Sequence, residues 1–229
     1  MLVVFNRNSA GRYTIGKDKV LHPFDADGMV SAITFKDGKA LFRNRFVRTN
    51  EFEEETKQKK ICYRSVFGTQ RAGGILSNIL DVKVKNPANT NVLHWNGQLF
   101  ALWEAGSPYQ LDPHTLHTIG KSTFQGILPS DTPLAAHYRI DAKTGRLVMF
   151  SAQPNPLSTT LTVYEFYPPD DPHSMPSSSS SLFKLHSKRT VCIPAFGLFH
   201  DFVITKHFYA FIRCPLTLQP LPFLLGLQV

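Results

Sequence analysis

The chain has 229 residues, of which 42% are hydrophobic and 12% aromatic, and it carries a formal net charge of +8. This composition excludes a disordered chain and predicts a folded domain, because a chain of this length and apolar content can bury a full core. Its three cysteines, Cys62, Cys192 and Cys214, are odd in number and irregularly spaced. That spacing excludes a disulfide framework and a cysteine zinc site, and it favours a reducing compartment such as cytoplasm or plastid.

No stretch approaches the roughly 20 apolar residues of a membrane-spanning helix. The apolar start, Met1 to Phe5, lacks the charged region and longer apolar core of a signal peptide. Basic residues cluster around Arg45, Lys59 and Lys188, and such a face can bind nucleic acid or an anionic membrane surface. Because no nucleic-acid motif accompanies the charge, we expect a solvated face and no nucleic-acid partner, with peripheral membrane contact left open.

Strand–turn–strand units recur along the chain. Each joins two apolar runs through a short turn, and Asp-Gly and Asn-Gly turns favour tight hairpins. In chain order the paired runs are 29–35 with 40–47, 91–95 with 98–104, 138–141 with 146–150, and 202–205 with 208–213. A further strand is expected over 161–167 and a charged loop or short helix over 51–60. Residues 168–190, which include consecutive serines, are expected to form a flexible loop within a single domain, 1–229.

The spacing of these units indicates the architecture. The turns are about 47 to 63 residues apart, near or above the roughly 40–50 residues of a propeller blade. We therefore predict an all-β chain of successive small antiparallel sheets, part of a β-propeller with about four blades, with a β-sandwich as the alternative. A partial ring leaves apolar blade faces exposed, so the chain is expected to be an incomplete domain.

Two histidines stand in unlike settings far apart in the sequence. His137 precedes the third hairpin and His200 begins the fourth. Each is set among small or apolar residues where an imidazole needs a partner, and a common metal site is one explanation. Two histidines alone would leave such a site half built. Glu104 follows an apolar run, where a carboxylate needs a partner, and metal-ligating histidines often donate their second N–H to a carboxylate.

Several segments together resemble the carotenoid cleavage oxygenase family, which includes apocarotenoid oxygenases and the retinal pigment epithelium isomerase. In the family's order they are the His-Pro-Phe-Asp-Ala-Asp-Gly-Met run at 22–29, Arg-Asn-Arg-Phe-Val-Arg-Thr at 43–49, Ala-Asn-Thr-Asn-Val at 88–92, Ala-Leu-Trp-Glu-Ala-Gly at 101–106, Leu-Asp-Pro-His-Thr-Leu at 111–116, the Ala-His to Thr-Gly run at 136–145, and His-Asp-Phe-Val-Ile-Thr at 200–205. The resemblance covers about residues 20 to 226, and the family's N-terminal strand is expected to be missing or replaced before residue 20.

The resemblance implies a seven-bladed β-propeller with an Fe(II) cofactor on its axis, held by four histidines that glutamates orient. His137 then matches the first ligand and His200 the second. Glu104 matches a glutamate that bonds His200, and Thr90 matches a side chain that crowds an open iron position. The third and fourth histidines would lie beyond Val229, so we expect this chain alone neither to retain iron stoichiometrically nor to cleave carotenoids.

The resemblance also implies a substrate tunnel. Trp103 matches a lining aromatic residue, and Phe24 and Phe199 are further candidates. The implied partners are a carotenoid or apocarotenoid and O₂, and the implied reaction is oxidative cleavage of a C=C bond to aldehyde or ketone fragments. Two alternatives stay open. One is a non-catalytic remnant that binds apocarotenoid or lipid, and the other is an unrelated propeller that serves as an interaction module.

Overall fold

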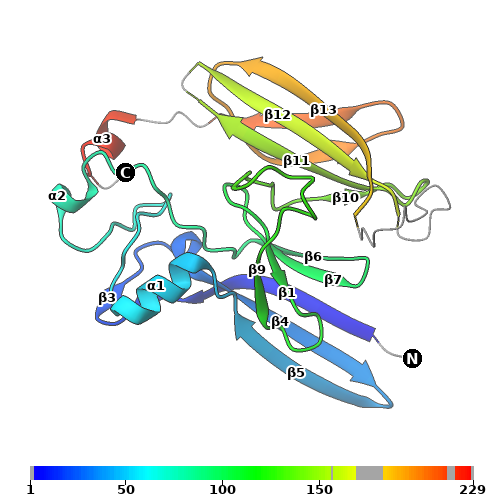
Figure 1. Cartoon of the computed structure of the whole chain (residues 1–229), viewed down its shortest axis with the longest axis horizontal. Helices are drawn as coiled ribbons and strands as arrows, with labels where there is room; N and C mark the ends of the chain where they lie inside the picture. Colours follow the sequence, from blue (N-terminus) through cyan, green and yellow to red (C-terminus); the bar gives the residue numbers. More distant parts are fainter. Residues whose placement is uncertain (1–2, 156, 169–182, 216–219, 228–229) are drawn as a thin grey trace.

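The computed structural model describes residues 3–155, 157–168, 183–215 and 220–227. These residues form an all-β domain, as predicted, whose larger sheets are all antiparallel and follow one another in chain order (Figure 1). Among the described residues there are four such sheets, and a small two-stranded sheet of β2 (Thr14–Ile15) and β3 (Asp18–Lys19) accompanies them.

The first sheet has the order β1-β4-β5. Its strands are β1 (Val3–Arg12), β4 (Asp27–Lys36) and β5 (Lys39–Phe46), and a short 3₁₀ helix, η1 (Pro23–Asp25), precedes β4. The β4–β5 turn uses Asp37 and Gly38 with φ of 49° and 73°, the positive values that a tight hairpin requires. Strand β1 pairs with β4 along most of its length, so the expectation of a missing strand before residue 20 was wrong. Its polar centre lacks the apolar alternation by which a strand is recognised.

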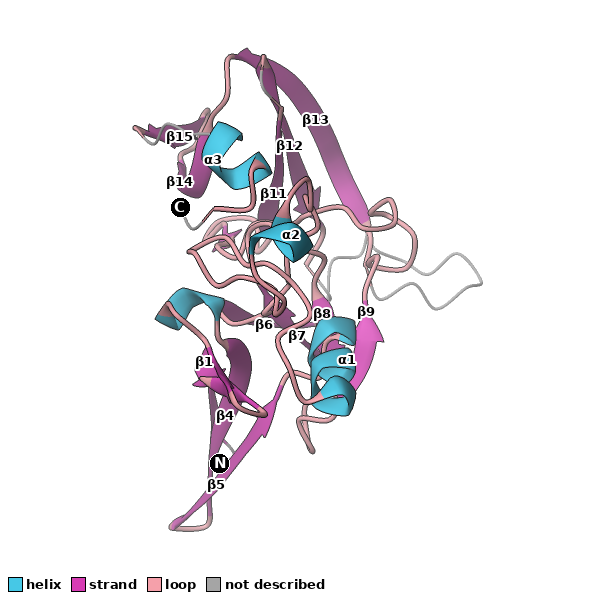
Figure 2. Cartoon of the chain, turned by 90° about the vertical axis from the view of Figure 1, so that its left-hand side faces the viewer, coloured by secondary structure: helices cyan, strands magenta, loops and turns pink. Residues whose placement is uncertain are grey.

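The second sheet has the order β6-β7-β8-β9. It comprises β6 (Asn91–Trp95), β7 (Gln98–Leu102), β8 (Tyr109–Leu111) and β9 (Thr118–Lys121). The predicted Asn96-Gly97 turn joins β6 to β7. Helix α1 (Asn50–Gln58) lies beside this sheet (Figure 2), and the Asn50 backbone N–H donates to the Tyr109 hydroxyl at 3.0 Å. The helix begins after Thr49, whose hydroxyl caps it.

The third and fourth sheets carry the two histidine segments. The third has the order β10-β11-β12-β13, with β10 (Arg139–Ile140), β11 (Leu147–Pro154), β12 (Ser158–Phe166) and β13 (Leu185–Pro194). The fourth pairs β14 (Leu198–Ile204) with β15 (Tyr209–Cys214). The predicted loop of residues 168–190 extends too far, because β13 begins at Leu185 and pairs with β12. Residues 169–182 of that prediction lie outside the described part.

The hydrophobic core consists of layers between successive sheets. On β7, Phe100 faces the third sheet whereas Leu99 faces the first, and both are fully buried. On β11, Met149 faces the second sheet and Phe150 packs toward β14. Alternate residues of one strand therefore fill two different layers. A β-sandwich has a single layer between two sheets, so this repeated stacking excludes that alternative.

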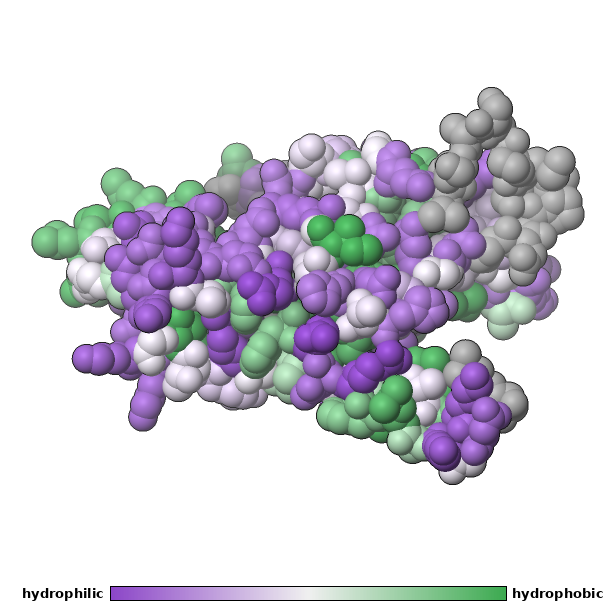
Figure 3. All heavy atoms as spheres, turned by 60° about the horizontal axis from the view of Figure 1, so that its bottom comes forward, coloured by the Kyte–Doolittle hydropathy of each residue, from purple (hydrophilic) through white to green (hydrophobic). Residues whose placement is uncertain are grey.

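Two short helices, α2 (Ile75–Asn78) and α3 (Pro220–Leu224), lie together at one end of the molecule. The buried Arg64 guanidinium connects the segment after α2 to α3, because it donates to the carbonyls of Asp81 at 3.1 Å and Phe223 at 2.7 Å. Figure 3 shows hydrophobic residues gathered at this end, where Leu76 is 87% and Leu80 73% exposed. No helix in the described residues is long and apolar enough to cross a membrane.

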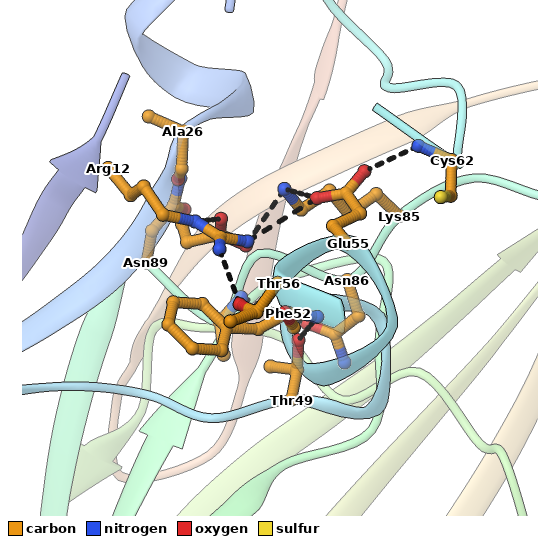
Figure 4. A network of polar contacts seen from close by, with 12 residues as sticks. Arg12, Ala26, Thr49, Phe52, Glu55, Thr56, Cys62, Lys85, Asn86 and Asn89 are labelled. Atoms are coloured by element: carbon orange, nitrogen blue, oxygen red, sulfur yellow. Dashed lines mark hydrogen bonds and ion pairs between the residues drawn. The ribbon is translucent and has the colours of Figure 1, made fainter. Parts of the chain in front are cut away.

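A buried ion cluster ties β1, β4 and α1 to the loop before β6 (Figure 4). Lys85 Nζ lies 2.9 Å from Asp27 Oδ1 and 2.7 Å from Glu55 Oε2. Arg12 Nε lies 2.6 Å from Asp27 Oδ2, and its Nη2 lies 3.4 Å from Glu55. Both carboxylate side chains have no exposed surface. Two cations facing two carboxylates compensate much of the cost of desolvating four charges.

Candidate metal centre

The two predicted histidines meet in the structure. His137 lies in the loop before β10 and His200 lies on β14, in different sheets. Their Nε2 atoms are 3.0 Å apart, and the ring planes are inclined at 71°. The fold thus brings together two imidazoles that are 63 positions apart in the sequence.

Backbone contacts on both sides fix the loop that carries His137. The Ala135 N–H donates to the Phe150 carbonyl of β11 at 2.8 Å. The Asn91 side-chain amide, at the start of β6, donates to the Ala136 carbonyl at 2.9 Å. The residue before His137 is therefore held between the second and third sheets. Sequence reasoning gave Asn91 no role, because its partner is a backbone carbonyl 45 positions away.

A β-bulge places His200. In the β14–β15 ladder Phe199 is opposite Arg213 and Phe202 is opposite Phe211, so His200 and Asp201 together face one residue of β15. An extra residue of this kind re-aims the side chains beside it. Phe199 and Phe202 are both buried in the layer against the third sheet, whereas His200 is exposed.

The position of Phe199 differs from the tunnel position expected for it. Phe199 is 7% exposed and packs edge-on against Phe211, with ring centroids 6.2 Å apart. It points into the core layer and does not line the cleft described below. The reason is the opposite orientation of neighbouring strand residues: with His200 directed outward, Phe199 faces inward.

Glu104 contacts His200. Its Oε1 lies 2.9 Å from His200 Nδ1. A carboxylate only accepts hydrogen bonds, so Nδ1 carries the proton and the lone pair of the neutral ring lies on Nε2, the atom that faces His137. The other carboxylate oxygen lies 3.2 Å from the Thr90 hydroxyl. Thr90 therefore contacts the glutamate that orients His200.

The donor set fits a transition-metal ion. Burial lowers the pKa of His137, and the neighbouring His200 lowers it further, so the ring is neutral at pH 7 and offers a lone pair. Two nitrogens each about 2.1 Å from one ion and at right angles around it would be about 3.0 Å apart, which matches the observed separation. Imidazole suits iron, copper, zinc and nickel. In the part of the chain that the structure describes, no group of three or more His, Cys, Asp or Glu residues is arranged to hold a metal.

An open cleft of about 640 Å³ borders this centre. His200, Glu104 and Thr90 line one part of it, and Trp103 and Phe24 line another. Phe24 packs edge-on against Phe67, which also lines the cleft, with ring centroids 5.2 Å apart. The cleft therefore combines an aromatic wall with the outer edge of the histidine pair.

The family model described as retinal pigment epithelial membrane protein matches residues 4–227. The chain belongs to this family. It is 43% identical over 229 residues to the apocarotenoid-15,15′-oxygenase of Synechocystis sp., covering 97% of this chain and 44% of that relative. It is also 34% identical to carotenoid cleavage oxygenase 1 of Neurospora crassa, covering 84% of this chain and 33% of that protein.

Solved structures agree with the sequence comparison. The cobalt-substituted Synechocystis apocarotenoid oxygenase matches with a TM-score of 0.89 and 42% identity, over 100% of this chain and 46% of that one. A chimera of that oxygenase with the retinal pigment epithelial protein matches with a TM-score of 0.87 and 41% identity, over 98% of this chain and 46% of the chimera. These structures are seven-bladed β-propellers, and the four sheets of this chain are successive blades, as predicted. The chain spans about half the length of the relatives it matches.

Sequence reasoning missed an ion pair beside the histidines. Arg139 Nη2 lies 2.8 Å from both carboxylate oxygens of Asp201. Burial raises the pKa of Asp201, but the hydrogen bonds from the Phe202 N–H and from Arg139 outweigh it and leave the pKa below its usual range. The available signals were Arg139, two residues after His137, and Asp201, directly after His200.

Proposed function

We propose that this chain supplies two ligands of an Fe(II) centre and part of the substrate tunnel of a dioxygenase that cleaves a C=C bond of a carotenoid or apocarotenoid. The observation that supports this most is the pair of Nε2 atoms 3.0 Å apart, with Glu104 bonded to the far nitrogen of His200. When bound, Fe(II) would supply a site at which O₂ can react beside the alkene. The names of the relatives, an apocarotenoid oxygenase and a carotenoid cleavage oxygenase, support the substrate class.

Each residue of the centre has a role that follows from its contacts. His137 and His200 would hold the ion through neutral nitrogens, which leave its positive charge uncompensated. Glu104 would offset that charge and fix the tautomer of His200 through the 2.9 Å contact. Thr90, 3.2 Å from Glu104 Oε2, would hold the carboxylate in place and narrow the approach to the ion.

The aromatic cleft would bind the polyene. Trp103 is 5% exposed and therefore preorganised, whereas Phe24 is 61% exposed and can cover a bound ligand. Burying apolar surface contributes about 25 cal/mol per Å², so a long unsaturated chain lying along the cleft would be bound largely through its own area. The position of the bound polyene along the cleft would decide which of its double bonds lies near the ion.

A second candidate function is binding of an apocarotenoid or lipid without turnover. It is favoured by the ligand count, because His137 and His200 are joined by no third ligand in the described residues. Two neutral ligands hold Fe(II) weakly, whereas the cleft depends on Trp103 and its neighbours and needs no metal. Binding could thus persist where catalysis is lost.

One experiment separates these functions. An apocarotenoid aldehyde is titrated into anaerobic protein with Fe(II) while Trp fluorescence is followed, and products are separated by chromatography after O₂ is admitted. The proposal predicts quenching that is lost in Trp103→Ala, and products only when the remaining blades of the longer relatives are supplied as a co-expressed second half. Quenching without products in the joined protein would favour binding alone. An absence of quenching would contradict both functions and leave an interaction module.

We also propose peripheral contact with a membrane surface. Exposed Leu76 and Leu80 lie beside α3, because the Leu80 N–H donates to the Leu224 carbonyl at 2.8 Å, and Leu221 of α3 is also exposed. The net charge of +8 favours an anionic surface. Co-sedimentation with anionic vesicles is expected to weaken in a Leu76→Ser/Leu80→Ser variant. Equal binding of this variant and the wild type would refute the assignment of the contact to this end.

A further inference from the structure

The ion pair between Arg139 and Asp201 runs parallel to the histidine pair. Arg139 is two residues after His137, and Asp201 directly follows His200. One nitrogen of Arg139, Nη2, is 2.8 Å from each oxygen of Asp201. The same two segments that present the imidazoles are thus also joined by a charge-assisted contact, two positions from His137 and one position from His200.

Further contacts fix both members of the pair. Arg139 Nη1 donates to the Tyr138 carbonyl at 2.9 Å, so the guanidinium bonds to the backbone directly after His137. Asp201 Oδ1 accepts the Phe202 N–H at 2.7 Å, so the carboxylate is fixed to the backbone of the bulge. The guanidinium carbon also lies 5.5 Å from the centre of the Phe202 ring.

The bulge in β14 makes this arrangement possible. In a regular strand Asp201 would point to the face opposite His200, into the layer that holds Phe199. The extra residue between Phe199 and Phe202 instead lets His200 reach Glu104 while Asp201 reaches Arg139. The described residues show no backbone ladder between β10 and β14, so side chains set the separation of the two segments at this point.

We propose that Arg139 and Asp201 are positioning residues that hold His137 and His200 at the spacing needed to bind one metal ion. This inference rests on the proposed metal centre and adds a determinant of its geometry. The side chain of Arg139 is 33% exposed and that of Asp201 is 43% exposed, and exposed ion pairs contribute little to the free energy of unfolding. Its effect is therefore expected in the preorganisation of the metal site and much less in the unfolding midpoint.

If Arg139 and Asp201 acted on the metal ion only through their charges, their variants would change metal affinity in opposite directions. Removing a cation beside a metal site should tighten binding of a cation, whereas removing an anion should weaken it. Positioning predicts that Arg139→Gln and Asp201→Asn both weaken binding, by about 10–100-fold, as for other groups that orient ligands. It also predicts that the swap Arg139→Asp/Asp201→Arg restores part of the loss.

The experiment is a titration with Co(II) alone, followed by its visible spectrum, for the wild type, the two single variants and the swap. Arg146→Gln is the matched control, because Arg146 forms a 3.5 Å ion pair with Glu165 in the same sheet. Unfolding midpoints of all variants are expected within about 4 °C of the wild type. Tighter binding in Arg139→Gln, or unchanged binding in both single variants, would overturn the proposal.

Two further measurements separate this inference from the metal centre itself. His137→Ala and His200→Ala should each abolish Co(II) binding, and binding that survives in both would refute the proposed centre. In the metal-free protein, the ring ¹⁵N signals of His137 and His200 should shift in Arg139→Gln and Asp201→Asn but not in Arg146→Gln. Unchanged ring signals in both single variants would refute positioning whether or not the metal binds.

Discussion

Replacing Lys85 with methionine should destabilise the fold strongly at neutral pH. Its Nζ contacts Asp27 at 2.9 Å and Glu55 at 2.7 Å, with 2% of the side chain exposed. The substitution leaves both carboxylates facing Arg12 alone, while the methionine retains most of the volume of the lysine stem. Removing one partner of a buried ion pair costs about 3–5 kcal/mol, and we expect a loss in that range.

The assay is urea unfolding at pH 7, with Lys83→Met as the matched control. Lys83 is exposed, and a substitution there should change the free energy of unfolding by no more than about 0.5 kcal/mol. A loss below about 1 kcal/mol for Lys85→Met would refute the view that this cluster depends on its lysine.

The pH dependence of the same variant gives a second test. Burial raises the pKa of Glu55 despite the opposing effect of Lys85, and removing Lys85 should raise it further. A carboxyl whose pKa is higher in the folded than in the unfolded state gains stability as pH falls through the folded pKa, because the folded state binds the proton more tightly. The deficit of Lys85→Met should therefore shrink between pH 7 and pH 5. A deficit that grows on acidification would contradict this account.

Three other predictions concern the centre and its supports. Glu104→Gln, which removes the carboxylate bonded to His200, should weaken Co(II) affinity by about 10–100-fold in a spectroscopic titration; an unchanged affinity would exclude this role. The pKa of His137 is lowered in the fold, so the free energy of unfolding should fall as pH drops below about 6.5. His137→Gln should therefore show a smaller fall in its urea midpoint between pH 7 and 5 than the wild type. Equal falls in the two proteins would contradict this role of His137. Gly28→Ala would place a Cβ 2.2 Å from the Ala88 carbonyl oxygen and should cost about 1–3 kcal/mol in urea unfolding; a neutral result would mean that the backbone yields easily there.

Local chemistry explains why most of the sheets could be predicted. The Asp37-Gly38 and Asn96-Gly97 turns adopt the positive φ that their residues allow, and the apolar runs beside them could be read directly. Strand β1 could not, because its Asn6 to Ser9 centre is polar and its pairing with β4 is a non-local interaction. The end of the serine-rich loop was misplaced for the same reason, since β13 mixes basic and apolar residues.

The candidate site was predictable in its residues but not in its geometry. His137, His200 and Glu104 could be named from motifs, whereas the 3.0 Å convergence depends on how three sheets stack. Phe199 was assigned to the tunnel because it precedes His200, although the alternation of strand residues turns its side chain into the core. The β14 bulge, which sets the directions of His200 and Asp201, has no signature in the sequence. Charged residues such as Lys85 are usually found at surfaces, and only the structure reveals their burial.

The most direct test of the central claim is an anaerobic calorimetric titration with Fe(II). The wild type, His137→Ala, His200→Ala and the surface control His207→Ala are compared at the same pH. The account predicts weak binding by the wild type and by His207→Ala, its loss in the other two variants, and loss of the bound iron on dialysis against a chelator. Equal binding by His137→Ala, or one iron per chain retained through the chelator, would contradict it.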